Sequence, residues 1–217
     1  MSLMVIGDGT TNADVDTNTN ALRVSPRPLE PSTGGFYHLC TFSGALTGVA
    51  GAGPVWSLRW TSSTLYFVLL SFRWSWYTTT AFGTTQIVDH SLYIARAFTG
   101  ADSAGTTATI SGNNCKVRTS MPTTAVANIQ YGATGAITAG TRTLDGQPLM
   151  TRRGISSGVN TMLTDNGGMD FRLRRDGPPV IFTNEGLVLN NVTAMGASGV
   201  IKLAVEVEWA EIPLAYY

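Results

Sequence analysis

The stretch Ile201-Lys-Leu-Ala-Val-Glu-Val-Glu-Trp-Ala210 alternates between large apolar side chains and charged or small ones. Successive side chains of a β-strand point to opposite faces, so this period of two predicts a strand with one face in a core. The other face would carry the carboxylates Glu206 and Glu208. The buried face would carry Ile201, Leu203, Val205, Val207 and Trp209.

The same period recurs earlier in the chain. Trp56, Leu58 and Trp60 fall on one face of a short run. A longer run predicts one long strand or a bent pair, with Ser71, Arg73 and Ser75 on its polar face and Tyr66, Val68, Leu70, Phe72, Trp74 and Trp76 on its apolar face. Weaker strand patterns cover Phe36–Phe42, Gln86–Phe98, Val126–Tyr131, Val180–Thr183 and Leu187–Val192.

Glycine-rich stretches separate these runs, and patterns with the helical period are nearly absent. Many short strands joined by such turns are typical of an antiparallel sandwich, whereas a parallel α/β fold needs helices between strands. We therefore expect an all-β, antiparallel β-sandwich, jelly-roll-like, with residues 21–217 forming a single domain. Residues 1–20 are polar after a short apolar start and would form an extended N-terminal arm.

The composition argues against several classes of partner. The net charge of zero gives no global attraction to nucleic acid or to an anionic membrane, and no apolar run approaches the length of a membrane span. No signal peptide is expected. The basic residues are nearly all arginine, with Lys116 and Lys202 as the lysines. Since arginine suits protein interfaces, we expect much of the surface to be covered in an assembly.

Two local patterns resemble catalytic ones without completing them. Residues Gly154-Ile-Ser-Ser-Gly158 fit G-x-S-x-G, but no histidine follows His90 in the chain, so a flexible loop is the better interpretation. His90 stands beside Asp89, and neighbours in a strand point to opposite faces, which prevents direct pairing. His38 lacks an acidic neighbour in the sequence. The sequence therefore predicts that the protein is not an enzyme.

Metal and cofactor sites are not expected either. Cys40 and Cys115 are too far apart in sequence for a zinc motif and are interpreted as buried thiols. Asp14, Asp16 and Asn18 alternate like the start of a calcium loop, but the glycine and glutamate that complete such a loop are absent. A solvated arm explains them better.

One local concentration of basic residues could make contacts. Asp170 and Asp176 flank part of it and no aromatic residues are interleaved, which disfavours single-stranded nucleic acid. A solvated loop and a salt-bridged contact with a neighbouring subunit remain open. The residues are Arg152, Arg153, Arg172, Arg174 and Arg175.

The chain ends in an apolar, aromatic segment that includes Leu214, Tyr216 and Tyr217. Exposed apolar clusters tend to mark contacts. We expect this segment to dock against a partner or a second subunit, or else to fold back over its own sandwich.

Several segments together resemble a family of virion proteins of tailed bacteriophages. The resemblance runs from about residue 20 to residue 211 and includes no catalytic motif. It implies a particle component, most naturally a decoration or cement protein on the head, and it carries no site residues. The segments are Asn20–Pro28, Ser111–Ser120, Ala139–Asp145, Asn184–Leu189 and Val205–Glu211.

These expectations define a virion protein, assembled in the bacterial host cytoplasm, that binds the major capsid protein or other virion proteins. The abundance of tryptophan and arginine motivates a homotrimer as a hypothesis, with the arm and the C-terminal segment reaching adjacent subunits. The alternative is a tail-associated receptor- or carbohydrate-binding module, because exposed tryptophans can stack on sugars. Trp56, Trp60, Trp74 and Trp76 fall on apolar strand faces, which favours the core instead.

Overall fold

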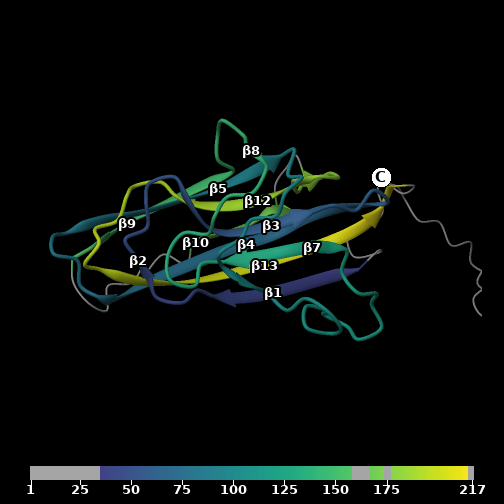
Figure 1. The fold of residues 1–217 in the computed structure, drawn as a ribbon. Helices are drawn as coiled ribbons and strands as arrows, with labels where there is room; N and C mark the ends of the chain where they lie inside the picture. The colour runs from purple at the N-terminus through teal and green to yellow at the C-terminus, as the bar shows by residue number, and fades with distance from the viewer. Residues whose placement is uncertain (1–34, 158–166, 174–176, 215–217) are drawn as a thin grey trace, which may run out of the picture.

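The computed structural model describes residues 35–157, 167–173 and 177–214. Two antiparallel sheets lie face to face around one continuous core, which confirms the predicted all-β sandwich (Figure 1). The jelly-roll connectivity stays a prediction. The arm predicted for residues 1–20 lies outside the described residues.

The six-stranded sheet has the order β1-β13-β4-β10, with β2 also paired to β13 and β11 to β4. A short 3-10 turn, η1 (Phe171–Leu173), follows β10. The strands are β1 (Phe36–Phe42), β2 (Leu46–Thr47), β4 (Leu65–Thr80), β10 (Gly167–Asp170), β11 (Val180–Ile181) and β13 (Val200–Pro213).

The seven-stranded sheet has the order β6-β7-β3-β12-β5-β8, and β9 pairs with β5 beside β8. The strands are β3 (Gly53–Trp60), β5 (Gln86–Arg96), β6 (Thr106–Thr107), β7 (Val126–Tyr131), β8 (Thr143–Leu144), β9 (Met150–Ser156) and β12 (Glu185–Asn191).

Strand β13 occupies the middle of the six-stranded sheet, between β1 and β4, although it comes last among them in the chain (Figure 1). The predicted alternation is confirmed: Ile201, Leu203, Val205, Val207 and Trp209 are all buried in the main core. Lys202, between the first two of them, is exposed. The outer face of this sheet is therefore polar along β13.

The predicted face of the long strand β4 is wrong over its first half. Leu69 pairs with Trp209 and Ser71 pairs with Glu208, so Leu70 is an extra residue in the ladder, a β-bulge. A bulge shifts the alternation by one residue. Phe67 and Leu69 consequently share the main core with Phe72, Trp74 and Trp76. Val68 and Leu70 lie in a second small cluster with Ala210 and Ile212.

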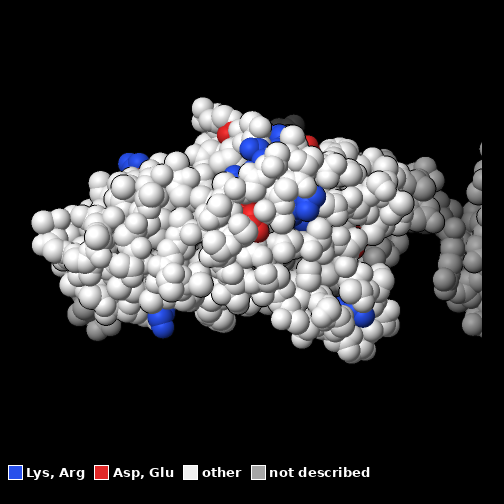
Figure 2. Space-filling view, in the orientation of Figure 1, with Lys and Arg blue, Asp and Glu red and all other residues white. Residues whose placement is uncertain are grey.

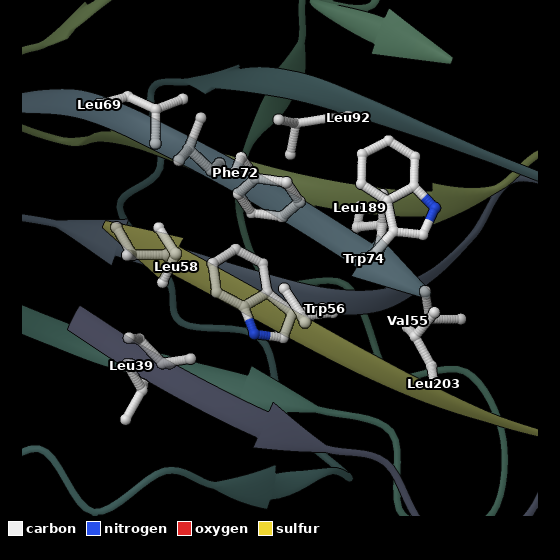
Figure 3. Packing of buried hydrophobic residues seen from close by; sticks show 14 of the residues in the cluster. Leu39, Val55, Trp56, Leu58, Leu69, Phe72, Trp74, Leu92, Leu189 and Leu203 are labelled. Atoms are coloured by element: carbon white, nitrogen blue, oxygen red, sulfur yellow. The ribbon is translucent and has the colours of Figure 1, made fainter. Parts of the chain in front are cut away.

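Aromatic side chains from both sheets fill the space between the layers. Trp209 stacks on Tyr37 at 5.4 Å and on Phe67 at 5.8 Å between ring centroids. Trp56 meets Phe72 edge to face, and both lie among leucine and valine side chains of the facing strands (Figure 3). The buried tryptophans Trp56, Trp60, Trp74, Trp76 and Trp209 are each at most 2% exposed.

The weaker strand predictions hold with small changes of boundary. Phe36–Phe42 and Val126–Tyr131 are strands with those bounds, whereas β5 ends at Arg96. Ala97 takes a positive φ of 48°, which ends the extended conformation. Residues 154–156, predicted as part of a flexible loop, instead belong to β9, which pairs along its length with β5.

Candidate functional site

The outer side of the six-stranded sheet carries several of the charged side chains that the fold brings together. Because β13 buries its odd-numbered side chains, Glu206 and Glu208 point outward. Glu206 lies opposite Cys40 of β1 and Arg73 of β4. We call this surface the charged face: His38, Cys40, Phe42, Arg73, Ser75, Tyr77, Asp170, Arg172, Glu206 and Glu208.

Ion pairs cross the strands of the charged face. His38 Nε2 lies 3.2 Å from Glu206 Oε1, and Arg172 Nη2 lies 3.3 Å from Glu208 Oε2. Arg172 also donates two hydrogen bonds to the carboxylate of Asp170, at 2.9 and 2.8 Å. These bonds lower the pKa of Asp170 and raise that of Arg172. Such exposed pairs add little stability, but they hold the side chains in one arrangement.

An open groove of about 580 Å³ runs along the charged face, lined by residues of β1, β4, β10 and β13. Arg73 lies in it against Gly168, where a Cβ atom would overlap the arginine side chain. Among the described residues, no hydrogen bond or ion pair engages the Arg73 guanidinium. Arg73 is therefore a solvent-facing cation, flanked by the carboxylates of Asp170 and Glu206.

Cys40 lies in the groove but is a poor candidate for a nucleophile. Partial burial and the nearby charge of Glu206 raise the pKa of its thiol. The reactive thiolate form is thereby disfavoured. The expectation of two buried thiols is wrong for Cys40, which is exposed because it sits on the outer face of β1, and right for Cys115.

Two aromatic side chains lie at the end of the charged face. Phe42 is 69% exposed and stands opposite Ala204, while Tyr77 is 41% exposed and stands opposite Lys202. Since both belong to the outer sheet surface, an apolar contact point adjoins the ion pairs.

The predicted basic residues divide between opposite sides of the sandwich. Arg153 lies on the outer side of β9, where its Nη2 is 2.6 Å from Asp89 Oδ2, and Arg152 lies on the side that faces the other sheet. Arg172 lies in η1 on the charged face. The structure thus does not gather them into one basic patch. Arg174 and Arg175 lie outside the described residues.

Of the predicted C-terminal contact residues, Leu214 follows β13 and is 42% exposed. Tyr216 and Tyr217 lie outside the described residues.

The G-x-S-x-G pattern does not form a nucleophile site. Ser156 is 1% exposed, and its Oγ lies 2.7 Å from the Thr78 Oγ1 of the facing sheet. This hydrogen bond between hydroxyl groups joins the two layers at one end of the sandwich. Ser156 therefore has a structural role.

Asp89 and His90 point to opposite sides of β5, as predicted. Asp89 pairs with Arg153 on the outside, whereas His90 faces the core and is fully buried. Neither ring nitrogen of His90 has a hydrogen-bond partner among the described residues, and burial lowers its pKa to about 4. His90 is thus an uncharged core residue. Within the described parts of the chain, no group of side chains is arranged to hold a metal ion.

The sequence alone does not predict the ion pairs of the charged face. His38 and Glu206 are 168 residues apart in the chain, and only the pairing of β1 with β13 brings them together. The alternation did identify Arg73, Glu206 and Glu208 as outward-facing. The missing information was the strand order.

Most of the surface on the side displayed in Figure 2 is uncharged, with scattered arginines, lysines and carboxylates. No helix in the described residues has the length and apolar character needed to span a membrane.

Comparison with known proteins adds little. No family model and no curated protein matches the chain. A solved structure, "Structure of infectious bursal disease virus Gx strain", aligns at 13% identity over 98% of this chain and 50% of that chain, with a TM-score of 0.18. The chain spans about half the length of that protein. A likeness this low carries no argument about fold or function.

Proposed function

We propose that this protein is a non-enzymatic structural component of a tailed-phage particle, a head decoration or cement protein that binds and stabilises neighbouring capsid subunits. One observation carries the proposal: the charged face joins cross-strand ion pairs and the unpaired Arg73 to the exposed rings of Phe42 and Tyr77. Aromatic residues and arginine are enriched at the centres of protein interfaces, with polar groups around them. The resemblance to virion proteins supplies the biological context.

The energetics suit a protein that is present in many copies. Burying apolar area contributes roughly 25 cal/mol per Å², so one Phe42 ring per contact gives modest affinity. When one protein makes several contacts across the capsid, each contact that forms raises the effective concentration for the next. Weak single contacts together can therefore stabilise the capsid. The ion pairs already hold His38, Glu206 and Arg172 in place, so little order of these side chains would have to be created on binding.

The state of the reactive groups also favours a binding role over an enzymatic one. The thiol of Cys40 has a raised pKa, and Ser156 and His90 are buried without access to a substrate. Arg172 is paired with the carboxylates of Asp170 and Glu208, which weakens the argument for phosphate and hence for nucleic acid as a partner.

The alternative is a tail-associated receptor- or carbohydrate-binding module that uses the same groove. Its polar lining, with Arg73, Ser75 and Glu206, offers hydrogen bonds to hydroxyl groups. Sugar binding on a sandwich generally also needs an aromatic platform, but the tryptophans are buried and Tyr77 lies beyond the lining of the groove. The decoration role is therefore the better-supported proposal.

The test begins with the position and copy number of the protein in purified particles, compared with particles assembled without it. We expect loss of the protein to leave heads that break at lower temperature, and added protein to restore them. Intact heads combined with lost adsorption to the host would instead support the tail role.

Variants of the charged face then locate the contact. Phe42→Asp combined with Arg73→Glu should abolish rebinding to heads, because it removes an apolar anchor and reverses an unpaired charge. Arg118→Glu is the matched control, since Arg118 is exposed and lies in the loop that follows Lys116, outside the charged face. Equal rebinding of both variants would contradict the assignment of the charged face as the contact.

A further inference from the structure

Strand β9 forms an edge of the seven-stranded sheet. Among the described residues it pairs only with β5, so its other side offers backbone N–H and C=O groups to an added strand. Sheets commonly bind an extended segment in this way, with backbone hydrogen bonds for affinity and alternate side chains for specificity.

The outer surface beside this edge is apolar. Ile87 and Ile155 face each other across β5 and β9 and are 46% and 62% exposed, and Val192 is 41% exposed. The N–H of Val192 donates to the carbonyl oxygen of Asp89, which places Val192 next to the ion pair between Asp89 and Arg153. We call Ile87, Ile155, Val192 and Arg153 the β9 patch.

The charge of the β9 patch selects the kind of segment that fits. β9 contains Arg152 and Arg153 and no acidic residue. Two copies of β9 paired with each other would bring like charges together, which disfavours self-pairing. The side chain of Asp89 is 1% exposed, so its carboxylate is buried. The Arg153 side chain is 65% exposed and can bind a second carboxylate. An acidic segment with an apolar side chain is therefore the complementary partner.

Residues 1–22 of this chain have that character. They contain Asp8, Asp14 and Asp16, no lysine or arginine, and an apolar run from Leu3 to Ile6. Within them, Ile6-Gly-Asp8 is the place where an apolar side chain stands two positions from a carboxylate. Side chains two positions apart lie on one face of a strand.

We propose that residues 4–8 of a second copy of this chain add to β9 as an antiparallel strand. In this register Ile6 lies opposite Ile155 and Asp8 lies opposite Arg153, on the outer face. Gly7 then lies opposite Gly154, which leaves room between the strands on the other face. The pairing buries Ile6 and Ile155 against each other and completes an ion-pair chain from Asp89 through Arg153 to Asp8.

The position of β9 explains why the segment comes from a neighbour. Phe36 pairs with Ala210 of β13, which in turn pairs with Val68 of β4. Ser156 contacts Thr78, which lies ten positions further along β4 than Val68. Ten residues of a strand span about 33 Å, so Phe36 and Ser156 are separated by about that distance along the strands. The start of β1 and β9 accordingly lie toward opposite ends of the molecule (Figure 1).

They also lie on opposite lateral edges, because β1 is one edge strand of its sheet and Ser156 contacts β4 near the other. A random coil of 27 residues, the number from Asp8 to Gly35, has an r.m.s. end-to-end distance of about 29 Å. That is shorter than the separation along β4 combined with the width of the sandwich, so the β9 of a neighbour is the better-matched acceptor. Repetition of this exchange around a ring links the subunits, which would account for the hypothesised homotrimer.

Disulfide trapping between separate chains tests the register. Both chains carry Cys40→Ser to remove the exposed native thiol. One chain carries Ile6→Cys and the other Ile155→Cys, and mixing followed by mild oxidation should give a covalent heterodimer. Val5→Cys with Ile155→Cys is the matched control and should crosslink about tenfold more slowly, because a shift of one residue moves the thiol to the other face.

A second measurement does not depend on disulfides. By mass photometry, the full chain should form an oligomer that is lost when residues 1–8 are removed. Asp8→Asn should weaken association about two- to fivefold, as expected for an exposed ion pair, whereas Asp14→Asn should leave it unchanged.

Three results would overturn the proposal: equal crosslinking from positions 5 and 6, crosslinking only within one chain when it carries both cysteines, or a full chain that stays monomeric at high concentration. Purified protein is sufficient for all of these experiments. Their outcome is therefore separate from whether the protein binds a capsid.

Discussion

The carboxylate of Glu211, near the end of β13, accepts a hydrogen bond from the backbone N–H of Ala125, 86 residues earlier in the chain, at 3.0 Å. The hydroxyl of Thr124 and the indole N–H of Trp209 donate to the same oxygen. Glu211 is 1% exposed. This single side chain thus ties the six-stranded sheet to the segment that enters β7 of the other sheet.

Glu211→Ala should lower the free energy of unfolding by about 2–4 kcal/mol, because it leaves the buried indole N–H of Trp209 and two partly buried donors without an acceptor. Glu211→Gln keeps a carbonyl oxygen in place and should cost about half as much or less. Urea denaturation of both variants measures the difference. A Glu211→Ala variant as stable as the native chain would mean that the carboxylate is not needed as an anchor.

Glu211 should also contribute to the pH dependence of stability. Burial raises its pKa, partly offset by its hydrogen bonds, so the native state binds a proton more tightly than the unfolded chain does. The free energy of unfolding should therefore fall as pH rises from the unfolded pKa of about 4.3 to the higher native value. Glu211→Gln should remove this slope in a comparison of unfolding midpoints.

His90 should give the opposite slope. Its native pKa of about 4 lies below the unfolded value near 6.5, because burial disfavours the charged ring despite nearby Asp89. The unfolded chain binds the proton more readily, so stability should fall as pH drops from 6.5 to 4, by about 3 kcal/mol in total. The difference between the native chain and His90→Leu, measured at several pH values, isolates this contribution. A flat difference would show that His90 is not buried as described.

The ion pair of Arg142 with Asp102 should be one of the strongest single contacts. Both side chains are at most 5% exposed, and Asp102 also accepts a hydrogen bond from the N–H of Gly140. Arg142→Ala should cost about 3–5 kcal/mol, because a buried carboxylate is left without its cation. Arg118→Ala, at an exposed position, is the control and should change thermal stability little.

Gly186 should not tolerate a side chain. It lies in β12 between β3 and β5, where a Cβ would overlap the carbonyl oxygen of Leu58 and come within 2.8 Å of the Phe98 ring. Gly186→Ala should lower the unfolding midpoint in urea or prevent folding, at a cost of about 2–4 kcal/mol. Gly146→Ala meets no atom within 4 Å and should be nearly neutral.

The sequence predicted the sandwich because alternate residues of β13 are buried from Ile201 to Trp209, so that the alternation of side chains reports directly on burial there, whereas β3 is buried on both faces over most of its length. It could not place the bulge at Leu70, because Val68 and Leu70 are as apolar as their neighbours in the main core, so the sequence does not show on which face they lie. β9 was missed for a related reason: an edge strand buries little, and Thr151-Arg-Arg-Gly154 has no apolar period. The charged face includes the pair of His38 and Glu206, which are 168 residues apart, and local sequence patterns carry no information about such pairing.

The place of β13 between β1 and β4 has a consequence for synthesis. A ribosome that has translated the chain as far as residue 199 has released both neighbours of β13 without the strand that joins them. The sheet that contains β4 is then incomplete. The tryptophan-rich inner face of β4 therefore stays exposed to water and to other nascent chains until residues 200–213 emerge. Pairing over such long sequence separations is slow, so this sheet should form late in folding and chaperones should engage the chain before β13 has paired.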